Sequence, residues 1–160
     1  KSVTERNSLL HLRRISKMNR NDLNIVIVED DEHDYEFLSR ILKKFNSPHK
    51  TTWLKDGEEV IDYLEKLASS KNQNPCKNVF LVDINLPKVN GLELIKIIKN
   101  QRNAKENFVI MVSGSTSKSD MDTAEKNGSD YFLKKPFGKQ EMDEFSNSLF
   151  SKLSSLIDES

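Results

Sequence analysis

Short strand-like runs alternate with helical patterns five times along this chain of 160 residues. The runs are too short for helices, whereas the segments between them repeat apolar residues every three or four positions. The predicted strands are Ile25–Val28, Lys50–Leu54, Val79–Val82, Phe108–Val112 and Tyr131–Leu133. The alternation predicts an α/β fold, with a five-stranded parallel sheet, doubly wound, and helices on both of its faces. Lys50–Leu54 is the least apolar run and is expected at an edge.

Polar side chains follow these strands at the points where the strands end. Asp83 comes directly after an apolar run and is followed by Leu-Pro and Asn-Gly, which stop a strand. The other polar residues at strand ends are Glu29, Asp30, Asp31, Ser113 and Lys135. The carboxyl ends of parallel strands meet at one edge of a sheet, where ligands commonly bind. We therefore expect these side chains to converge on a site.

The acidic residues predict a cation at this edge. Consecutive carboxylates at the end of a buried strand raise the free energy of one another's ionised forms, so a positive charge is expected nearby. Asp30 and Asp83 are the natural ligand pair for Mg²⁺, which prefers oxygen ligands. Asp83 could then attack a phosphoryl group whose charge is balanced by the cation, Lys135 and Ser113, with Gly114 leaving room for it. Lys135 precedes Pro136, and an unusual peptide bond between them would aim the lysine.

From about Leu23 to the C-terminus, the chain resembles the receiver domain of two-component response regulators. The motifs that carry the resemblance are Ile-Val-Ile-Val-Glu-Asp-Asp (25–31), Val-Asp-Ile-Asn-Leu-Pro-Lys-Val-Asn-Gly (82–91), Val-Ser-Gly (112–114) and Leu-Lys-Lys-Pro-Phe (133–137). The run at 56–64 and the long polar loop at 69–78 are similar to the stand-alone, phytochrome-associated branch. The resemblance implies a flavodoxin-like sheet of strand order 2-1-3-4-5.

The resemblance also implies a role for each site residue. Asp83 would be the phosphoacceptor, with Mg²⁺ as cofactor and a sensor histidine kinase or phosphotransfer protein as phosphoryl donor. The implied assignments are Asp30 as a direct metal ligand, Glu29 as an outer-sphere acid, Asn85 as a ligand through its carbonyl, Ser113 as the switch hydroxyl, Lys135 as the conserved-type lysine and Phe132 as the rotating aromatic. Glu29 stands where Asp is common, and Ser113 replaces a frequent Thr, which loosens the rotamer of the hydroxyl.

Two other functions compete with a phosphorylated switch. A haloacid-dehalogenase-type phosphatase also phosphorylates an Asp at a strand end, but it needs a general acid two residues later, where this chain has Asn85. A pseudo-receiver would only bind partners, and the intact set of acids, hydroxyl and lysine argues against it. The protein is therefore not expected to be a conventional enzyme, although it would catalyse its own aspartyl phosphorylation and dephosphorylation.

The switch is expected to act through the 114–157 face. Met121 and Ala124 are the only apolar residues of segment 114–128 and are expected to be its only anchors, which predicts a weakly anchored helix. The last helix has a broad apolar stripe that includes Met142 and Phe145. A downstream protein or a second copy of the chain, forming a homodimer, is the expected partner of this face.

Composition limits where the protein acts. The formal net charge is zero, so no overall field attracts nucleic acid or a membrane. No transmembrane run or signal peptide is visible, and the single Cys76, interpreted as an ordinary loop residue, cannot form an internal disulfide. These observations favour a cytoplasmic protein.

Residues 1–22 are predicted to be an appendage to the receiver domain at 23–160. Six Lys/Arg and two acids give them a net charge of +4, and Leu9, Leu12 and Ile15 have helical spacing. A docking helix, a membrane-surface segment and a phosphotransfer histidine at His11 are the functional alternatives to a marginal helix or disordered tail.

Overall fold

The computed structural model describes residues 22–70, 76–101, 107–115 and 117–158. The predicted N-terminal helix and His11 lie outside these residues. The elements are β1 (Leu23–Val28), α2 (Glu32–Lys43), β2 (His49–Leu54), α3 (Gly57–Ser69), β3 (Lys77–Val82), α4 (Gly91–Lys99), β4 (Asn107–Ser113), α5 (Lys118–Lys126), β5 (Tyr131–Lys134) and α6 (Lys139–Asp158).

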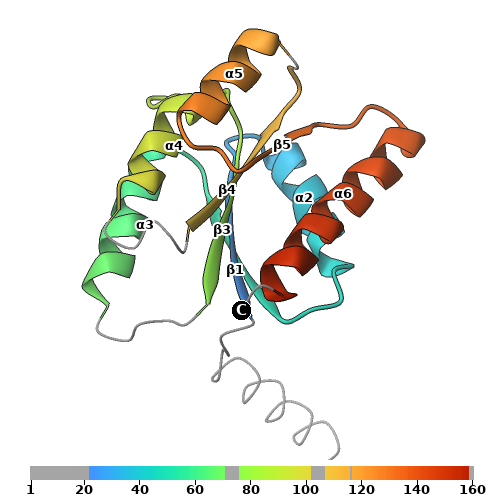
Figure 1. Cartoon of the computed structure of the whole chain (residues 1–160), viewed down its shortest axis with the longest axis horizontal. Helices are drawn as coiled ribbons and strands as arrows, with labels where there is room; N and C mark the ends of the chain where they lie inside the picture. The colour runs from blue at the N-terminus through green and yellow to red at the C-terminus, as the bar shows by residue number, and fades with distance from the viewer. Residues whose placement is uncertain (1–21, 71–75, 102–106, 116, 159–160) are drawn as a thin grey trace, which may run out of the picture.

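The strands form one parallel sheet in the order β2-β1-β3-β4-β5 (Figure 1). This confirms the predicted doubly wound, five-stranded fold and its strand order. Both neighbours of β1 pair along its whole length, and all six of its residues are buried. β2 lies at the edge, as its composition predicted, and its Lys50 and Thr51 are exposed.

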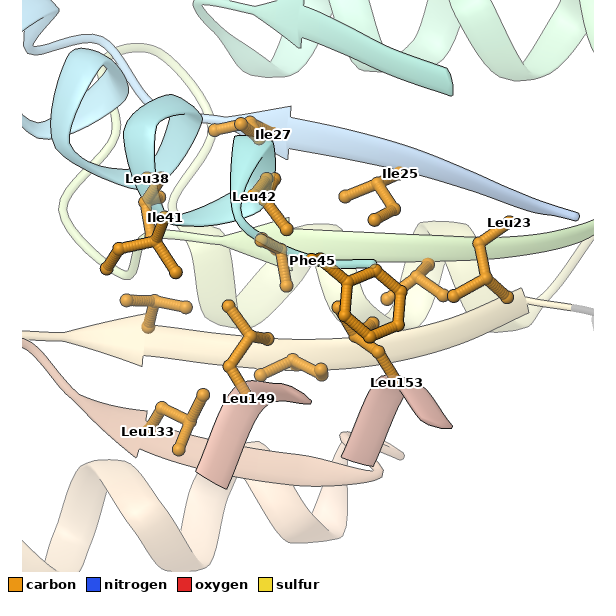
Figure 2. Packing of buried hydrophobic residues seen from close by; sticks show 14 of the residues in the cluster. Leu23, Ile25, Ile27, Leu38, Ile41, Leu42, Phe45, Leu133, Leu149 and Leu153 are labelled. Atoms are coloured by element: carbon orange, nitrogen blue, oxygen red, sulfur yellow. The ribbon is translucent and has the colours of Figure 1, made fainter. Parts of the chain in front are cut away.

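The helices form a layer on each face of the sheet (Figure 1). Alternate strand residues pack against each layer. Ile25 of β1 faces α2 and α6, whereas its neighbour Val26 belongs to the cluster with α3, α4 and α5. Figure 2 shows the layer that α2 and α6 form, with Leu42 of α2 and Leu149 of α6 close to the side of the sheet that bears Ile25. The continuous apolar runs of the sequence therefore reflect burial on both faces.

Side-chain caps begin the helices that follow β1 to β4. Asp31, Asp56, Asn90 and Ser117 each accept a hydrogen bond from a backbone N–H of the first helical turn. These caps satisfy backbone donors that a helix start leaves without partners. They bring the starts of α2 to α5 near the carboxyl ends of the strands, where the polar site residues stand.

The helix α5 has one buried residue, Ala124. Met121 is 42% exposed, so the prediction that it anchors this helix is wrong. Polar contacts hold the end of α5 instead: Gly128, with φ +101°, closes it in a left-handed turn, and Asn127 Nδ2 donates to the Leu92 carbonyl at 2.8 Å. α5 is thus anchored more by its C-terminal turn than by apolar packing.

A row of asparagines crosses the amino-terminal edge of the sheet. Asn24, Asn78 and Asn107 lie in register on β1, β3 and β4. Asn24 Nδ2 donates to Asn78 Oδ1 at 2.8 Å, and Asn78 Nδ2 donates to Asn107 Oδ1 at 3.0 Å. Asn24 Nδ2 also donates to the Tyr63 hydroxyl at 2.8 Å. Two hydrogen bonds thus join the three amides side chain to side chain where the strands begin.

Two further sequence interpretations concern Pro136 and Cys76, and the first needs correction. The Lys135–Pro136 peptide bond is trans, because the described residues contain no cis peptide bond. Cys76 lies in the bend before β3, as a loop residue was predicted to, and it is buried there, at 2% exposure. Among the described residues, no helix is long and apolar enough to cross a bilayer.

Candidate phosphoacceptor site

The strand order brings the predicted acids, hydroxyl and lysine to one edge of the sheet. β3, which ends before Asp83, lies between β1 and β4, so the acids after β1 and the hydroxyl at the end of β4 come from its two neighbours. One carboxylate oxygen from each of Glu29, Asp30 and Asp83 lies within 4.8 Å of the others. The carboxylates that were predicted to bind a cation are therefore together.

Asp83 is 6% exposed and follows the central strand of the sheet. Its Oδ2 is 3.4 Å from the Lys135 ammonium, while its Oδ1 is buried without a hydrogen-bond partner among the described residues. Its backbone N–H donates to the Val28 carbonyl at 3.1 Å, which fixes the residue against the end of β1. A buried carboxylate oxygen without a donor has a large desolvation cost, which a bound cation would offset.

The loop after Asp83 folds back closely on it. Gly91, the first residue of α4, donates its N–H to the Ile84 carbonyl at 2.9 Å. A Cβ atom at this position would lie 2.0 Å from the Asp83 carbonyl oxygen, so any other residue would displace the backbone. Packing thus requires the glycine of the Asn-Gly pair that ends the motif, and Asn90 caps α4.

Glu29 is almost completely buried, at 2% exposure. Its Oε2 accepts from the Lys135 ammonium at 2.9 Å, and its Oε1 accepts from the Asp31 N–H at 3.1 Å. Burial raises the pKa of Glu29 to about 7, although these two hydrogen bonds oppose the rise; the charge on Asp83 adds to it. A cation bound nearby would favour the ionised carboxylate and lower this pKa again.

Lys135 forms ion pairs with three carboxylates. Its Nζ is 2.7 Å from Asp34, 2.9 Å from Glu29 and 3.4 Å from Asp83. Burial lowers the pKa of Lys135, but the hydrogen bonds to Asp34 and Glu29 and the charge on Asp83 outweigh it and hold the pKa above its usual value. The lysine is therefore a permanent ammonium at neutral pH.

Ser113 is fully buried at the end of β4. Its Oγ accepts from the Ser115 N–H at 3.1 Å, and its carbonyl accepts from the Lys135 N–H at 2.8 Å. Phe132 on β5 is half-buried against the cluster of α3, α4 and α5, and Asn85 is exposed. A Cβ at Gly114 would meet no atom within 4 Å, which agrees with the predicted open space beside the hydroxyl.

The donor set suits Mg²⁺. Carboxylate oxygens from Glu29, Asp30 and Asp83 are hard ligands, and two carboxylates with water are a common Mg²⁺ environment. The buried Asp83 Oδ1 without a donor is the specific observation that favours a cation here. The geometry thus fits the predicted metal.

Sequence reasoning missed two residues that contact this group. Asp34, in the first turn of α2, pairs with Lys135, and Trp53 of β2 donates its indole N–H to the Glu29 carbonyl at 2.8 Å. The Trp53 ring is stacked on Tyr35, with centroids 3.9 Å apart. Asp34 is one of several acids after β1, and we interpreted only the acids directly at the strand end as functional.

Comparisons with known proteins agree with this geometry. The response regulator receiver domain family matches residues 25–146. The chain therefore belongs to the response regulator receiver domains, which act in two-component signalling. This confirms the resemblance predicted from the four motifs.

Individual response regulators and chemotaxis proteins are similar to this chain. Response regulator Rcp1 of Synechocystis is 30% identical over 97 residues, 61% of this chain and 65% of that protein. Chemotaxis protein CheY1 of Helicobacter pylori is 28% identical over 122 residues, 76% and 92% of the two chains. The Mn²⁺-bound structure of Rcp1 has a TM-score of 0.67 at 23% identity and covers 80% of this chain and 91% of its own.

Proposed function

We propose that the chain accepts a phosphoryl group on Asp83 from a sensor histidine kinase or phosphotransfer protein, in a reaction that requires Mg²⁺. The observation that carries the proposal is the buried Asp83 carboxylate, of which one oxygen has no donor among the residues that the structure describes and the other is 3.4 Å from the Lys135 ammonium. Membership of the receiver family supports the same reaction.

The proposed chemistry is nucleophilic displacement at phosphorus. An Asp83 oxygen forms a bond to the phosphorus, the bond from phosphorus to the donor's leaving group breaks, and the leaving group keeps the electron pair. Lys135 supplies a fixed positive charge for the phosphoryl oxygens, and the Ser113 hydroxyl supplies a hydrogen bond. Mg²⁺, when bound, would neutralise further charge on those oxygens. Water later hydrolyses the aspartyl phosphate, so the protein also limits its own signal.

The metal ligands are proposed from the same cluster. Asp30 and Asp83 would bind Mg²⁺ directly, Glu29 would act through water, and Asn85 would contribute its backbone carbonyl. The proximity of the three acids and the orphaned Asp83 Oδ1 support this assignment. The Mn²⁺-bound form of Rcp1 is a divalent-cation complex of a structural neighbour.

We propose that phosphorylation changes binding at the 114–157 face, with a second copy of the chain as its first candidate partner. Ser113 would move toward the phosphoryl group and Phe132 would move into the space that it leaves. The single buried residue of α5 supports a mobile segment, and the exposed Met121, Phe137 and Met142 support an apolar contact surface.

Intact-mass measurement tests the phosphoryl transfer. Wild type and Asp83→Asn are incubated with acetyl phosphate, with Mg²⁺ or with excess EDTA. We expect one added phosphoryl group on wild type with Mg²⁺ only, and none on the variant. Equal labelling of the two proteins would refute Asp83 as the acceptor. Partner binding by a wild type that never accepts phosphate would instead support a pseudo-receiver.

A further inference from the structure

Asp34 makes the shortest of the three ion pairs of Lys135. Its Oδ2 lies 2.7 Å from the ammonium, and the two residues are 101 positions apart in sequence. The Asp34 side chain is 44% exposed, whereas the Glu29 side chain is 2% exposed. Asp34 also lies outside the group of three acids that could hold a cation. It is therefore a partner for the lysine that does not belong to the candidate metal site.

Helix capping does not account for the orientation of Asp34. An acid at the third helical position commonly turns back to accept from the backbone N–H of the cap residue. Here the N–H of the cap residue, Asp31, donates to Glu29 Oε1 at 3.1 Å, and the Asp34 N–H donates to Asp31 Oδ1 at 2.9 Å. The start of α2 is thus satisfied without the Asp34 carboxylate, which contacts Lys135 instead.

The other two partners of Lys135 are in the group that would bind a cation. When oxygens of Glu29 and Asp83 turn to a metal, the ammonium loses part of their attraction, and the Asp34 carboxylate remains. When a phosphoryl group is added to Asp83, the same ammonium is needed on a phosphoryl oxygen. A charge-assisted contact with Asp34 must then weaken for the new contact to form.

We propose that Asp34 is a positioning residue that retains the Lys135 ammonium while a cation binds and releases it when Asp83 is phosphorylated. The release half of this inference depends on the proposed function, and the retention half depends only on cation binding. Asp34 thereby favours the unphosphorylated, metal-bound form of the site over the phosphorylated form.

The two halves of the proposal predict that Asp34→Asn lowers the affinity for Mg²⁺ and raises the affinity for a phosphoryl mimic. Without the carboxylate, the ammonium is left to Glu29 and Asp83 and competes with the cation, so Mg²⁺ affinity should fall about fivefold, as expected for one partly exposed charge pair. At saturating Mg²⁺, affinity for beryllofluoride should rise about fivefold, because no carboxylate competes with this phosphoryl mimic for the lysine. Titration calorimetry measures both affinities, and the single Trp53, bonded to Glu29, offers a fluorescence signal.

Two controls separate this role from general electrostatics. Glu32 is an exposed acid in the same helical turn, so Glu32→Gln removes a charge from α2 without removing a contact with Lys135. It should change either affinity by less than about twofold. In a protein that already carries Lys135→Gln, Asp34→Asn should change the affinities for Mg²⁺ and beryllofluoride much less, because both changes act through the lysine.

The outcomes decide each half separately. Equal changes in Mg²⁺ affinity from Asp34→Asn and Glu32→Gln, or an unchanged effect in the Lys135→Gln background, would refute retention of the lysine by Asp34. Unchanged or weaker beryllofluoride binding by Asp34→Asn would refute its release. A wild type that binds Mg²⁺ but not beryllofluoride would refute the proposed function together with the release, while the Mg²⁺ titrations would still decide the retention.

Discussion

Polar side chains line both edges of the sheet, where the strands begin and where they end. They form a neutral hydrogen-bonded row at one edge and a charged group at the other. At the amino-terminal edge, the amides of Asn24, Asn78 and Asn107 bond to one another across three strands. At the carboxyl-terminal edge, the carboxylates of Glu29 and Asp83 face each other and depend on Lys135. Within the described part of the chain, each edge has one buried side-chain oxygen without a partner, Asn24 Oδ1 and Asp83 Oδ1.

The difference lies in what each functional group can donate and accept. An amide is both donor and acceptor, so amides in a row can bond to one another and remain neutral. An ionised carboxylate only accepts, so a group of carboxylates needs cations from elsewhere. The first edge is therefore suited to joining strands, and the second is suited to binding a cation and reacting.

Asn78→Ala should have the largest effect on stability. It removes the central amide of the row, leaves Asn107 Oδ1 without its donor, and should lower the free energy of unfolding by about 1–3 kcal/mol. Mg²⁺ binding and phosphoryl uptake should be unchanged, because the site is at the opposite edge. Urea unfolding and intact mass measure the two properties.

The matched control for this variant is Asn147→Ala, at an exposed position of α6, which should change stability by less than about 0.5 kcal/mol. If Asn78→Ala were as stable as this control, the amide row would not join the strands. If it lost phosphoryl uptake while still folded, the two edges would not be independent.

Asp83→Asn should act in the opposite direction on stability. It removes one negative charge from a group in which Glu29, Asp30, Asp34 and Asp83 outnumber Lys135, so the variant should be more stable by about 1 kcal/mol in EDTA. Added Mg²⁺ should stabilise wild type more than the variant, because it binds the native carboxylates. A variant less stable than wild type in EDTA would mean that the Lys135–Asp83 attraction outweighs the repulsion.

Ser113→Ala should have the smallest effect on stability and a specific effect on switching. It removes the acceptor for the Ser115 N–H in an exposed loop, so stability should fall by less than about 1 kcal/mol. Asp83 should still accept phosphate, but most of the phosphorylation-dependent change in self-association should be lost. Sedimentation of wild type and variant, with and without beryllofluoride, tests this. An equal shift in both would show that the switch does not act through Ser113.

The sequence was sufficient for the fold and for the convergence of the acids, but not for the contacts of the lysine. Asp83 and Glu29 were predicted because each directly ends an apolar run, which fixes its place at the sheet edge. Asp34 was missed because it lies inside a helix, where an acid in the first turn is ordinary. Met121 was misjudged because an apolar residue in a helix of few apolar residues was assumed to be buried, and it is 42% exposed.

The sequence by itself determined the alternation of strands and helices, the burial of both sheet faces and the polar residue at each strand end, because these depend on local periodicity and on where apolar runs stop. Only the tertiary structure decided which carboxylates share the Lys135 ammonium, and that Trp53 bonds to the Glu29 carbonyl. Those contacts join segments up to 106 positions apart. Their geometry is set by how α2 and the segment after β5 pack around the sheet, which no local pattern records.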